Sequence, residues 1–434
     1  MDLPLDAATP AAPTSDSAPA IHPAPQPGRP AEPLPRGFVP LLVIAAVGAG
    51  AAQMSGALLT FQLKATVFGD SATTIYSLSS ALAAVFTVLA LPTVGALSDR
   101  SRSRFGRRRP YLVAAAAAFA LGGTLLVTAT HPAVFVLAHL LITLGFTTAG
   151  VTTIALLADR LPADRRGPTA AFLSLSTALG ALVGMGVTTP FGADLAPMVA
   201  LPTAIAVLGL LALTAVLREE RSTRPRTPLR WREVVGIFWV NPLRFPDFAF
   251  VFSSRLLVFS GVAALNGYQV FYLLRRVGLE PAQLSGAILL TVVVNCGISL
   301  LVAPAIGKLS DRLGVRKPFI LVAAIILAAG LVLASTATSF PAYLVGGAVV
   351  ALGQGVYFAV ELTLATQVLP DPENPAKDLA LIKVADNLPV AFVSAAAPAL
   401  LALGGGDNYS ALFLAGALCA VVGGFLIQFV RSAR

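Results

Sequence analysis

The chain has 434 residues, of which 56% are hydrophobic and only 12% are charged, and its mean hydropathy is +0.81. A water-soluble domain carries about twice that charged fraction, so the composition excludes a soluble globular domain and indicates a membrane protein. The net charge of +9 would suggest nucleic acid as a partner in a soluble chain, but here the placement of the cations matters more than their sum. Both cysteines, Cys296 and Cys419, lie in apolar runs, which leaves no disulfide framework and no cysteine metal site.

The N-terminal tail, residues 1–36, is rich in proline and alanine and has no helical or strand periodicity. We expect it to be a disordered cytoplasmic tail. It lacks the apolar stretch of a signal peptide.

Twelve apolar segments follow, each long enough to cross a hydrocarbon layer of about 30 Å as a helix. Short turns marked by Gly or Pro separate most of them, and barrel strands would be half as long. The sequence therefore predicts an all-α membrane protein with twelve transmembrane helices. The expected spans are 38–63, 74–97, 110–130, 133–158, 169–189, 197–217, 248–273, 283–306, 318–338, 341–368, 379–402 and 410–430.

The positive residues predict the orientation. With the N-terminus in the cytoplasm, most of the 30 lysines and arginines lie in the tail, the cytoplasmic turns or the C-terminus, whereas Lys64, Arg275 and Arg276 lie outside. This distribution indicates a multi-pass protein with both termini in the cytoplasm.

The longest connection, residues 218–247, divides the helices into an N-terminal half, 37–217, and a C-terminal half, 248–434. Within this linker Trp231 and Phe238 share one face of a possible short helix, which is typical of a helix lying among lipid headgroups. A solvated linker with two chance tryptophans is the alternative.

An internal repeat links the two halves. The second predicted helix leads into GALSDRSRSRFGRRRPY, residues 95–111, and the eighth leads into GKLSDRLGVRKP, residues 307–318. The two segments match at constant spacing apart from one short insertion. The matched residues that we expect to act in gating are Gly95, Asp99, Arg100, Gly106 and Arg108 in the first copy, and Gly307, Asp311, Arg312 and Arg316 in the second.

A G-x-L-x-D-R-x-G-x-R turn after helices 2 and 8 of a six-plus-six bundle resembles the major facilitator superfamily of secondary transporters. The resemblance implies two halves related by an axis along the membrane normal, a central cavity and alternating access. The spelling of residues 98–110 is similar to the same turn in sucrose transporters and their bacterial relatives, within the glycoside cation-symporter branch. Further similarities are residues 155–159, Gly353-x-Gly355-x-Tyr357 with Glu361, and the segments 377–379 and 387–389.

The chain departs from that branch in helix 4, because Thr143 and Ile154 stand where sucrose transporters carry an aspartate and an arginine.

The physics of the repeated turn supports gating. Asp99 ends a helix whose dipole disfavours an anion, so it needs a compensating arginine or the amino end of a neighbouring helix, helix 11 in this fold. Gly95 would permit close approach there. For Arg107, Arg108 and Arg109 we expect anionic lipids or acidic residues of neighbouring turns as partners. In the alternative interpretation the arginines only mark the cytoplasmic side.

Charges inside the predicted spans are candidates for proton coupling, since a charge near the bilayer midplane is costly unless paired or hydrated. Arg255, Glu361 and Asp386 lie at a common depth, and Lys383 shares a helix face with Asp386. A carboxylate that loses its cation takes up a proton more readily, and Glu361 is the first choice for this role, with Asp386 second. The alternative is a permanent structural ion pair.

A polyol substrate needs amides, hydroxyls and an aromatic face aimed inward from rigid helices. The alternative for each such residue is a hydrogen bond to a neighbouring helix. The predicted substrate-binding residues are Gln53, Asn266, Tyr268, Gln269, Asn295, Gln354 and Tyr357.

The sequence thus predicts a monomeric secondary transporter of the plasma membrane, without cofactor, metal or enzymatic activity, that moves a sugar or glycoside with protons and contacts membrane lipids. The alternatives are a proton-driven exporter of drug-like or apolar metabolites and a non-transporting receptor or scaffold. Gly307-Lys308 is only a fragment of a phosphate-binding loop, which leaves ATP hydrolysis unsupported.

Overall fold

A computed structural model describes residues 37–101, 103–217, 219, 244–368, 375–404 and 406–431. The predicted disordered tail and the predicted interfacial helix of the linker lie outside these residues.

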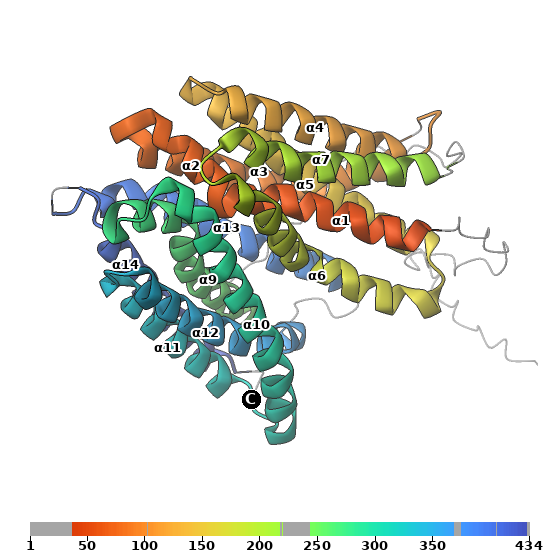
Figure 1. The fold of residues 1–434 in the computed structure, drawn as a ribbon. Coiled ribbons are helices and arrows are strands. Elements are labelled where there is room, and N and C mark those ends of the chain that lie inside the picture. The colour runs from red at the N-terminus through yellow and green to blue at the C-terminus, as the bar shows by residue number, and fades with distance from the viewer. Residues whose placement is uncertain are drawn as a thin grey trace, which may run out of the picture. The chain divides into compact units, whose positions relative to one another are not determined.

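The N-terminal half consists of helices joined by short turns (Figure 1). Prolines stand at the first turns of several of them, where their missing N–H groups cost nothing. The elements are α1 (Phe38–Ser55), η1 (Gly56–Thr60), α2 (Phe61–Ala65), η2 (Thr66–Ser71), α3 (Ala72–Arg100), α4 (Arg109–Thr128), α5 (Pro132–Arg160), α6 (Ala163–Thr188), η3 (Thr189–Phe191) and α7 (Leu195–Val216).

The C-terminal half repeats this plan. Its elements are α9 (Pro246–Tyr272), η4 (Leu273–Val277), α10 (Pro281–Leu313), α11 (Lys317–Thr336), α12 (Phe340–Gln367), α13 (Pro375–Leu401), α14 (Tyr409–Leu426) and η5 (Ile427–Phe429). Both η1 and η4 are π-helical turns.

Among the described residues, eleven helical stretches are long and apolar enough to cross a membrane. The first, Phe38–Arg100, is 63 residues long and is broken at Gly69, whose φ of 58° and ψ of −127° no helix contains. It therefore provides two spans, α1 with α2 and then α3. The predicted fold class, twelve helices in two sets of six, is confirmed.

The helices extend further into the polar turns than the apolar pattern indicates. α3 continues to Arg100 and α10 to Leu313, so each repeated segment begins inside the last part of a helix, residues 95–100 in the first copy and 307–313 in the second. α6 begins at Ala163, six residues before the predicted start at 169. Apolar composition marks only the part of a helix inside lipid, and the polar ends of these helices extend beyond it.

Packing inside each half depends on small residues. α1 packs against α6 and α7 in the first half, and α9 packs against α14 in the second. A Cβ atom at Gly180 of α6 would lie 2.6 Å from the carbonyl carbon of Gly50, and one at Gly184 would lie 2.5 Å from the oxygen of Ala51. Glycine at these two positions allows the backbones to touch. Between the halves, α3 lies along α13 and α6 along α10 (Figure 1).

Candidate functional site

Three charged side chains from the second half meet inside the bundle. Arg255 comes from α9, Glu361 from α12 and Asp386 from α13. The Arg255 Nε donates to Asp386 Oδ1 at 2.6 Å, and Nη2 lies 2.5 Å from the same oxygen. Arg255 Nη1 forms an ion pair with Glu361. The structure thus brings together the three residues that the sequence places at a common depth, and we call them the charge cluster.

The charge cluster is shielded from solvent mainly on the side of Glu361. Arg255 is 5% and Glu361 2% exposed, whereas the Asp386 side chain is 26% exposed. Burying ions of this kind is costly unless each is paired, and here one guanidinium serves two carboxylates. The Arg255 guanidinium also lies 5.3 Å above the ring of Phe259, a cation–π distance. The charge cluster thus contains two carboxylates and one guanidinium.

Two further predicted residues lie near this cluster or beside it along the chain. Tyr357 is buried and packs edge-on against Phe259, with the ring centroids 5.7 Å apart. Lys383 stands one turn before Asp386 on α13, but its side chain lies outside the described part of the chain.

Two of the predicted substrate-binding amides have an unused oxygen. Gln53 Oε1 on α1 and Asn295 Oδ1 on α10 are buried and make no hydrogen bond within the part of the chain that the structure describes. A buried polar atom left without a partner costs about 1–3 kcal/mol, so such atoms mark places where a ligand gains most from binding. Gln354 on α12 is half-buried.

The other three predicted substrate-binding residues contact the opposite half instead. Tyr268 and Gln269 are 1% and 2% exposed. The hydroxyl of Tyr268 lies 2.6 Å from that of Ser77 on α3, and Gln269 Nε2 donates to the Leu58 oxygen at 3.1 Å. The backbone oxygen of Asn266 accepts from a first-half side chain at 3.0 Å. In this conformation the three residues close the predicted outer end rather than line a cavity.

That first-half side chain belongs to Gln62, a residue that the sequence analysis missed. Gln62 is fully buried and donates to the oxygens of Ala57 and Asn266, while its Oε1 accepts from Val270 N at 2.9 Å. The sequence pattern that points to Gln62 is a lone amide near the end of the predicted span 38–63. Within that span, only Gln53 is among the predicted substrate-binding residues.

In the first gating turn, Arg108 is the central residue. Its guanidinium donates to Ser98 Oγ at 2.6 Å, to Asp99 Oδ1 at 2.7 Å and to Asp159 Oδ2 at 3.0 Å, and the side chain is 5% exposed. Arg107 also bonds Asp159, at 2.5 Å. The arginine that compensates Asp99 therefore comes from the same turn, and acidic residues of neighbouring turns are the partners here. The side chains at the start of α13, where the alternative partner was expected, lie outside the described residues.

Glu219, just after α7, closes the first turn from the linker side. Its Oε2 accepts from the backbone N–H groups of Arg108 and Arg109 at 2.7 and 3.0 Å. These are free donors at the start of α4, where a negative charge also suits the helix dipole. Gly106 has a φ of 101° and lies against Glu219. A Cβ atom added to Gly106 would collide with the Glu219 side chain. The repeat predicts a role for Gly106, but no sequence pattern points to its partner Glu219.

The second gating turn repeats the glycine with positive φ and has looser contacts. Gly314 also has a positive φ, 64°. Arg316 lies 3.7 Å from Asp311, whose side chain is 73% exposed. Arg100 and Arg312 stand in the last turns of α3 and α10, where a cation suits the helix dipole.

Close approach at Gly95 and Gly307 is not seen in this conformation. A Cβ at Gly95 would meet only Val151 at 3.8 Å, and one at Gly307 only the oxygen of Ala359 at 3.8 Å. Both distances are ordinary van der Waals contacts, so the close helix contact expected at Gly95 is absent among the described residues, and its counterpart Gly307 has none either.

On α5, the positions that differ from the sucrose transporters are a buried Thr143 and an Ile154 that is 62% exposed.

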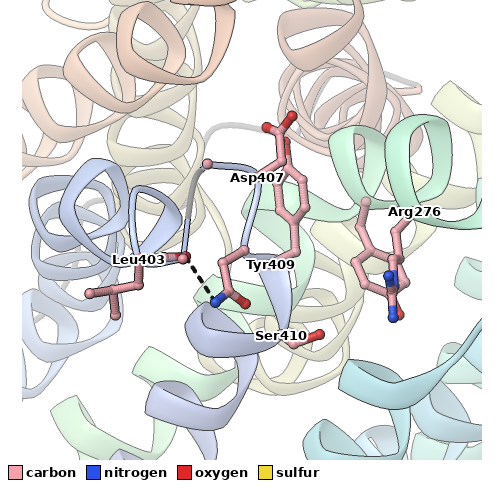
Figure 2. A pocket seen from close by; sticks show the side chains of 9 residues that line it. Arg276, Leu403, Asp407, Tyr409 and Ser410 are labelled. Carbon is pink, nitrogen blue, oxygen red and sulfur yellow. Dashed lines mark hydrogen bonds between the residues drawn. The ribbon is translucent and has the colours of Figure 1, made fainter.

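A polar pocket of about 260 Å³ lies at the predicted outer end between α9, α13 and α14 (Figure 2). Its polar groups are mostly committed to the protein. Tyr272 donates to the oxygen of Ala334, Asn408 Nδ2 donates to the oxygen of Leu403, and Asp407 pairs with Arg275. None of the predicted substrate-binding residues lines this pocket.

Two six-helix halves, a buried charge cluster and a repeated turn define a polytopic helical membrane protein. The sequence model of the Major Facilitator Superfamily matches residues 41–303 and 288–434, and the chain belongs to this superfamily. It is therefore a transporter of a small molecule rather than an enzyme. No match was found among curated proteins.

Solved structures of transporters share the fold. The nucleoside transporter NupG is 15% identical with a TM-score of 0.70 and covers 91% of this chain and 99% of its own. A D-xylose-proton symporter is 18% identical with a TM-score of 0.65, covering 91% and 98%. A peptide transporter in complex with alafosfalin is 15% identical with a TM-score of 0.72, covering 91% and 94%. Identities this low establish the fold alone.

Proposed function

We propose that this transporter is a proton-coupled symporter of a sugar or glycoside, within the branch that includes the sucrose transporters. The observation that carries the proposal is the charge cluster, in which Arg255 is shared between Glu361 and Asp386. Its two carboxylates are groups to which a proton can bind inside an otherwise apolar bundle.

In this mechanism Arg255 is shared between the two carboxylates. When the helices shift and a carboxylate moves away from the guanidinium, that carboxylate takes up a proton more readily, because apolar surroundings favour its neutral form. Since α9, α12 and α13 each supply one member, a change of pairing changes how these helices hold together. Glu361 is the proposed proton carrier, with Asp386 second, and Lys383 is a further cation on α13.

The proposed sugar contacts are the polar residues around the central axis. The unpartnered oxygens of Gln53 and Asn295 suit sugar hydroxyl donors, and Gln354 with Tyr357 adds an amide and an aromatic face. Asn266, Tyr268 and Gln269 join them once the predicted outer end opens. Thr143 and Ile154 do not reproduce the helix 4 pair of the sucrose transporters, and for this reason we assign charge coupling to the second half.

The proposal also covers the location and orientation of the protein in the membrane. We place the protein in the plasma membrane as a monomer with both termini in the cytoplasm. The two repeated turns act as cytoplasmic gates, and their arginines, with the linker helix, contact anionic lipids.

The test is transport into liposomes containing the purified protein, with an imposed pH gradient. A labelled sugar from a broad panel should accumulate above its outside concentration, and a protonophore should abolish the accumulation. Asp194→Asn serves as the control, because Asp194 caps α7 far along the chain from the cluster and asparagine caps equally well.

Extrusion of hydrophobic dyes without movement of any sugar would replace the symporter by an exporter. Movement of neither class under a pH gradient would favour a receptor or scaffold.

A further inference from the structure

Two glutamines, one from each half, bind the helix backbone of the opposite half at the predicted outer end. Gln62 belongs to α2 and Gln269 to α9, and both side chains are almost wholly buried, with exposed fractions of 0% and 2%. Each one uses its amide on main-chain groups rather than on another side chain.

Gln62 occupies one hydrogen-bonding step of α9. The N–H of Val270 and the carbonyl of Asn266 are partners in a regular α-helix, because they are four residues apart. The Gln62 amide bonds both of them, accepting from Val270 N at 2.9 Å and donating to the Asn266 oxygen at 3.0 Å. Gly267, between them, presents no side chain to the incoming amide. A side chain inserted in this way is one of the known causes of local helix distortion.

Gln269 occupies the corresponding place on the first half. Its Nε2 donates at 3.1 Å to the oxygen of Leu58, which lies in the π-helical turn η1. In a π-helical turn the N–H groups reach back five residues, as that of Phe61 does to Gly56, and carbonyls of the turn become available to other donors. The Gln62 Nε2 takes a second one, that of Ala57, at 3.1 Å. The irregular turn and the two glutamines thus form one arrangement.

We propose that Gln62 and Gln269 form a reciprocal glutamine clasp that holds the outer side of the transporter shut while its cytoplasmic side is open. The proposal rests on the proposed alternating-access function. To open outward, the halves must break the three hydrogen bonds of the clasp that join them directly, those to Asn266, to Val270 and to Leu58, together with the contact between Tyr268 and Ser77. The clasp is specific to the closed outer state because each amide reaches main-chain atoms of the opposite half.

The test measures the opening of the outer end directly. A chain with Cys296→Ser and Cys419→Ser has no native cysteine left, and spin labels are placed at Val67→Cys and Leu403→Cys, which are 65% and 54% exposed on opposite halves. Pulsed electron paramagnetic resonance then gives the distribution of label distances in liposomes. Gln62→Met and Gln269→Met keep the side-chain length and remove the hydrogen bonds.

Gln283→Met is the matched control, because Gln283 is an amide at the same end whose Oε1 accepts from Glu280 N within α10. The ratio of long to short distances should rise about fivefold for each lost bond between halves, so Gln62→Met, which loses two, should exceed Gln269→Met, which loses one. The double variant should exceed both, and Gln283→Met should leave the distribution unchanged.

Unchanged distributions in both clasp variants, or an equal shift in the control, would overturn the clasp. If Gln62→Met does not fold, Gln269→Met alone tests the clasp, because the loss of its single hydrogen bond between the halves still predicts a rise of about fivefold. Failure of the clasp would leave sugar accumulation by the unaltered protein intact, whereas failure of the proposed function would abolish accumulation and leave the distance shifts in place.

Discussion

At the scale of single residues, arginine is used where one cation must serve several anions. Arg108 bonds Ser98, Asp99 and Asp159 together, and Arg255 pairs with Glu361 and Asp386. The planar guanidinium offers five donors in a fixed fork, which an ammonium group cannot reproduce. We therefore expect lysine to be a poor substitute at both positions.

Glu361→Gln tests the proposed proton carrier. The amide keeps the shape of the carboxyl group but cannot exchange a proton, so uphill sugar uptake driven by a pH gradient should be lost while exchange of labelled for unlabelled sugar continues. Both rates are measured in the same liposomes. Uphill accumulation at the normal level in Glu361→Gln would remove this residue from the coupling mechanism.

At the scale of elements, the two gating turns share residues of the repeat but differ in their contacts. Both contain a glycine with positive φ and an arginine facing an aspartate. In the first turn, Glu219 caps the helix that follows, and Arg108 lies 2.7 Å from Asp99. In the second turn, Arg316 lies 3.7 Å from Asp311. The first turn should therefore behave as a rigid block.

Gly106→Ala should damage the first turn. A left-handed alanine costs about 1–2 kcal/mol, and the collision of its Cβ with Glu219 adds to this cost. The melting temperature and the transport rate should both fall. Gly314→Ala is the control, since φ is positive there but nothing lies within 4 Å of the added Cβ, and its loss should be clearly smaller. Equal losses would show that Glu219 does not press on this glycine.

Asp99→Asn and Asp311→Asn compare the contributions of the two gating turns to the transport rate. Removing the charge of Asp99 weakens a close ion pair with buried Arg108, so the maximal transport rate should fall several-fold with little change in the sugar concentration for half-maximal uptake. Asp311→Asn should have less effect on rate, because its pair is longer and more exposed. A normal rate in Asp99→Asn would contradict the gating assignment.

At the scale of the whole molecule, the orientation in the membrane is testable with single cysteines. In a chain without native cysteines, Leu403→Cys should react with an impermeant thiol reagent added to intact cells. Phe105→Cys, with a side chain 55% exposed in the first gating turn, should react only after permeabilisation. The reversed pattern would place the termini outside.

The fold was predictable because long apolar runs and a repeated motif are local properties of the sequence. For the charge cluster, the sequence predicts that its three residues lie at a common depth, because each is about equally far from the end of its helix. The clasp was not, since it depends on which carbonyls a π-helical turn makes available, and nothing in residues 56–60 encodes that turn visibly. Glu219 was missed for a similar reason, because its partners are backbone groups brought together only by folding.

Proton binding to the charge cluster has an electrical consequence. On the proposed mechanism, the carrier loaded with one proton and a neutral sugar carries one more positive charge than the empty carrier that returns. Each complete cycle therefore moves one positive charge inward. A membrane potential that is negative inside would add to the pH gradient as a driving force for uptake, and at 100 mV a full elementary charge is worth about 2.3 kcal/mol, or about fifty-fold in the accumulation ratio.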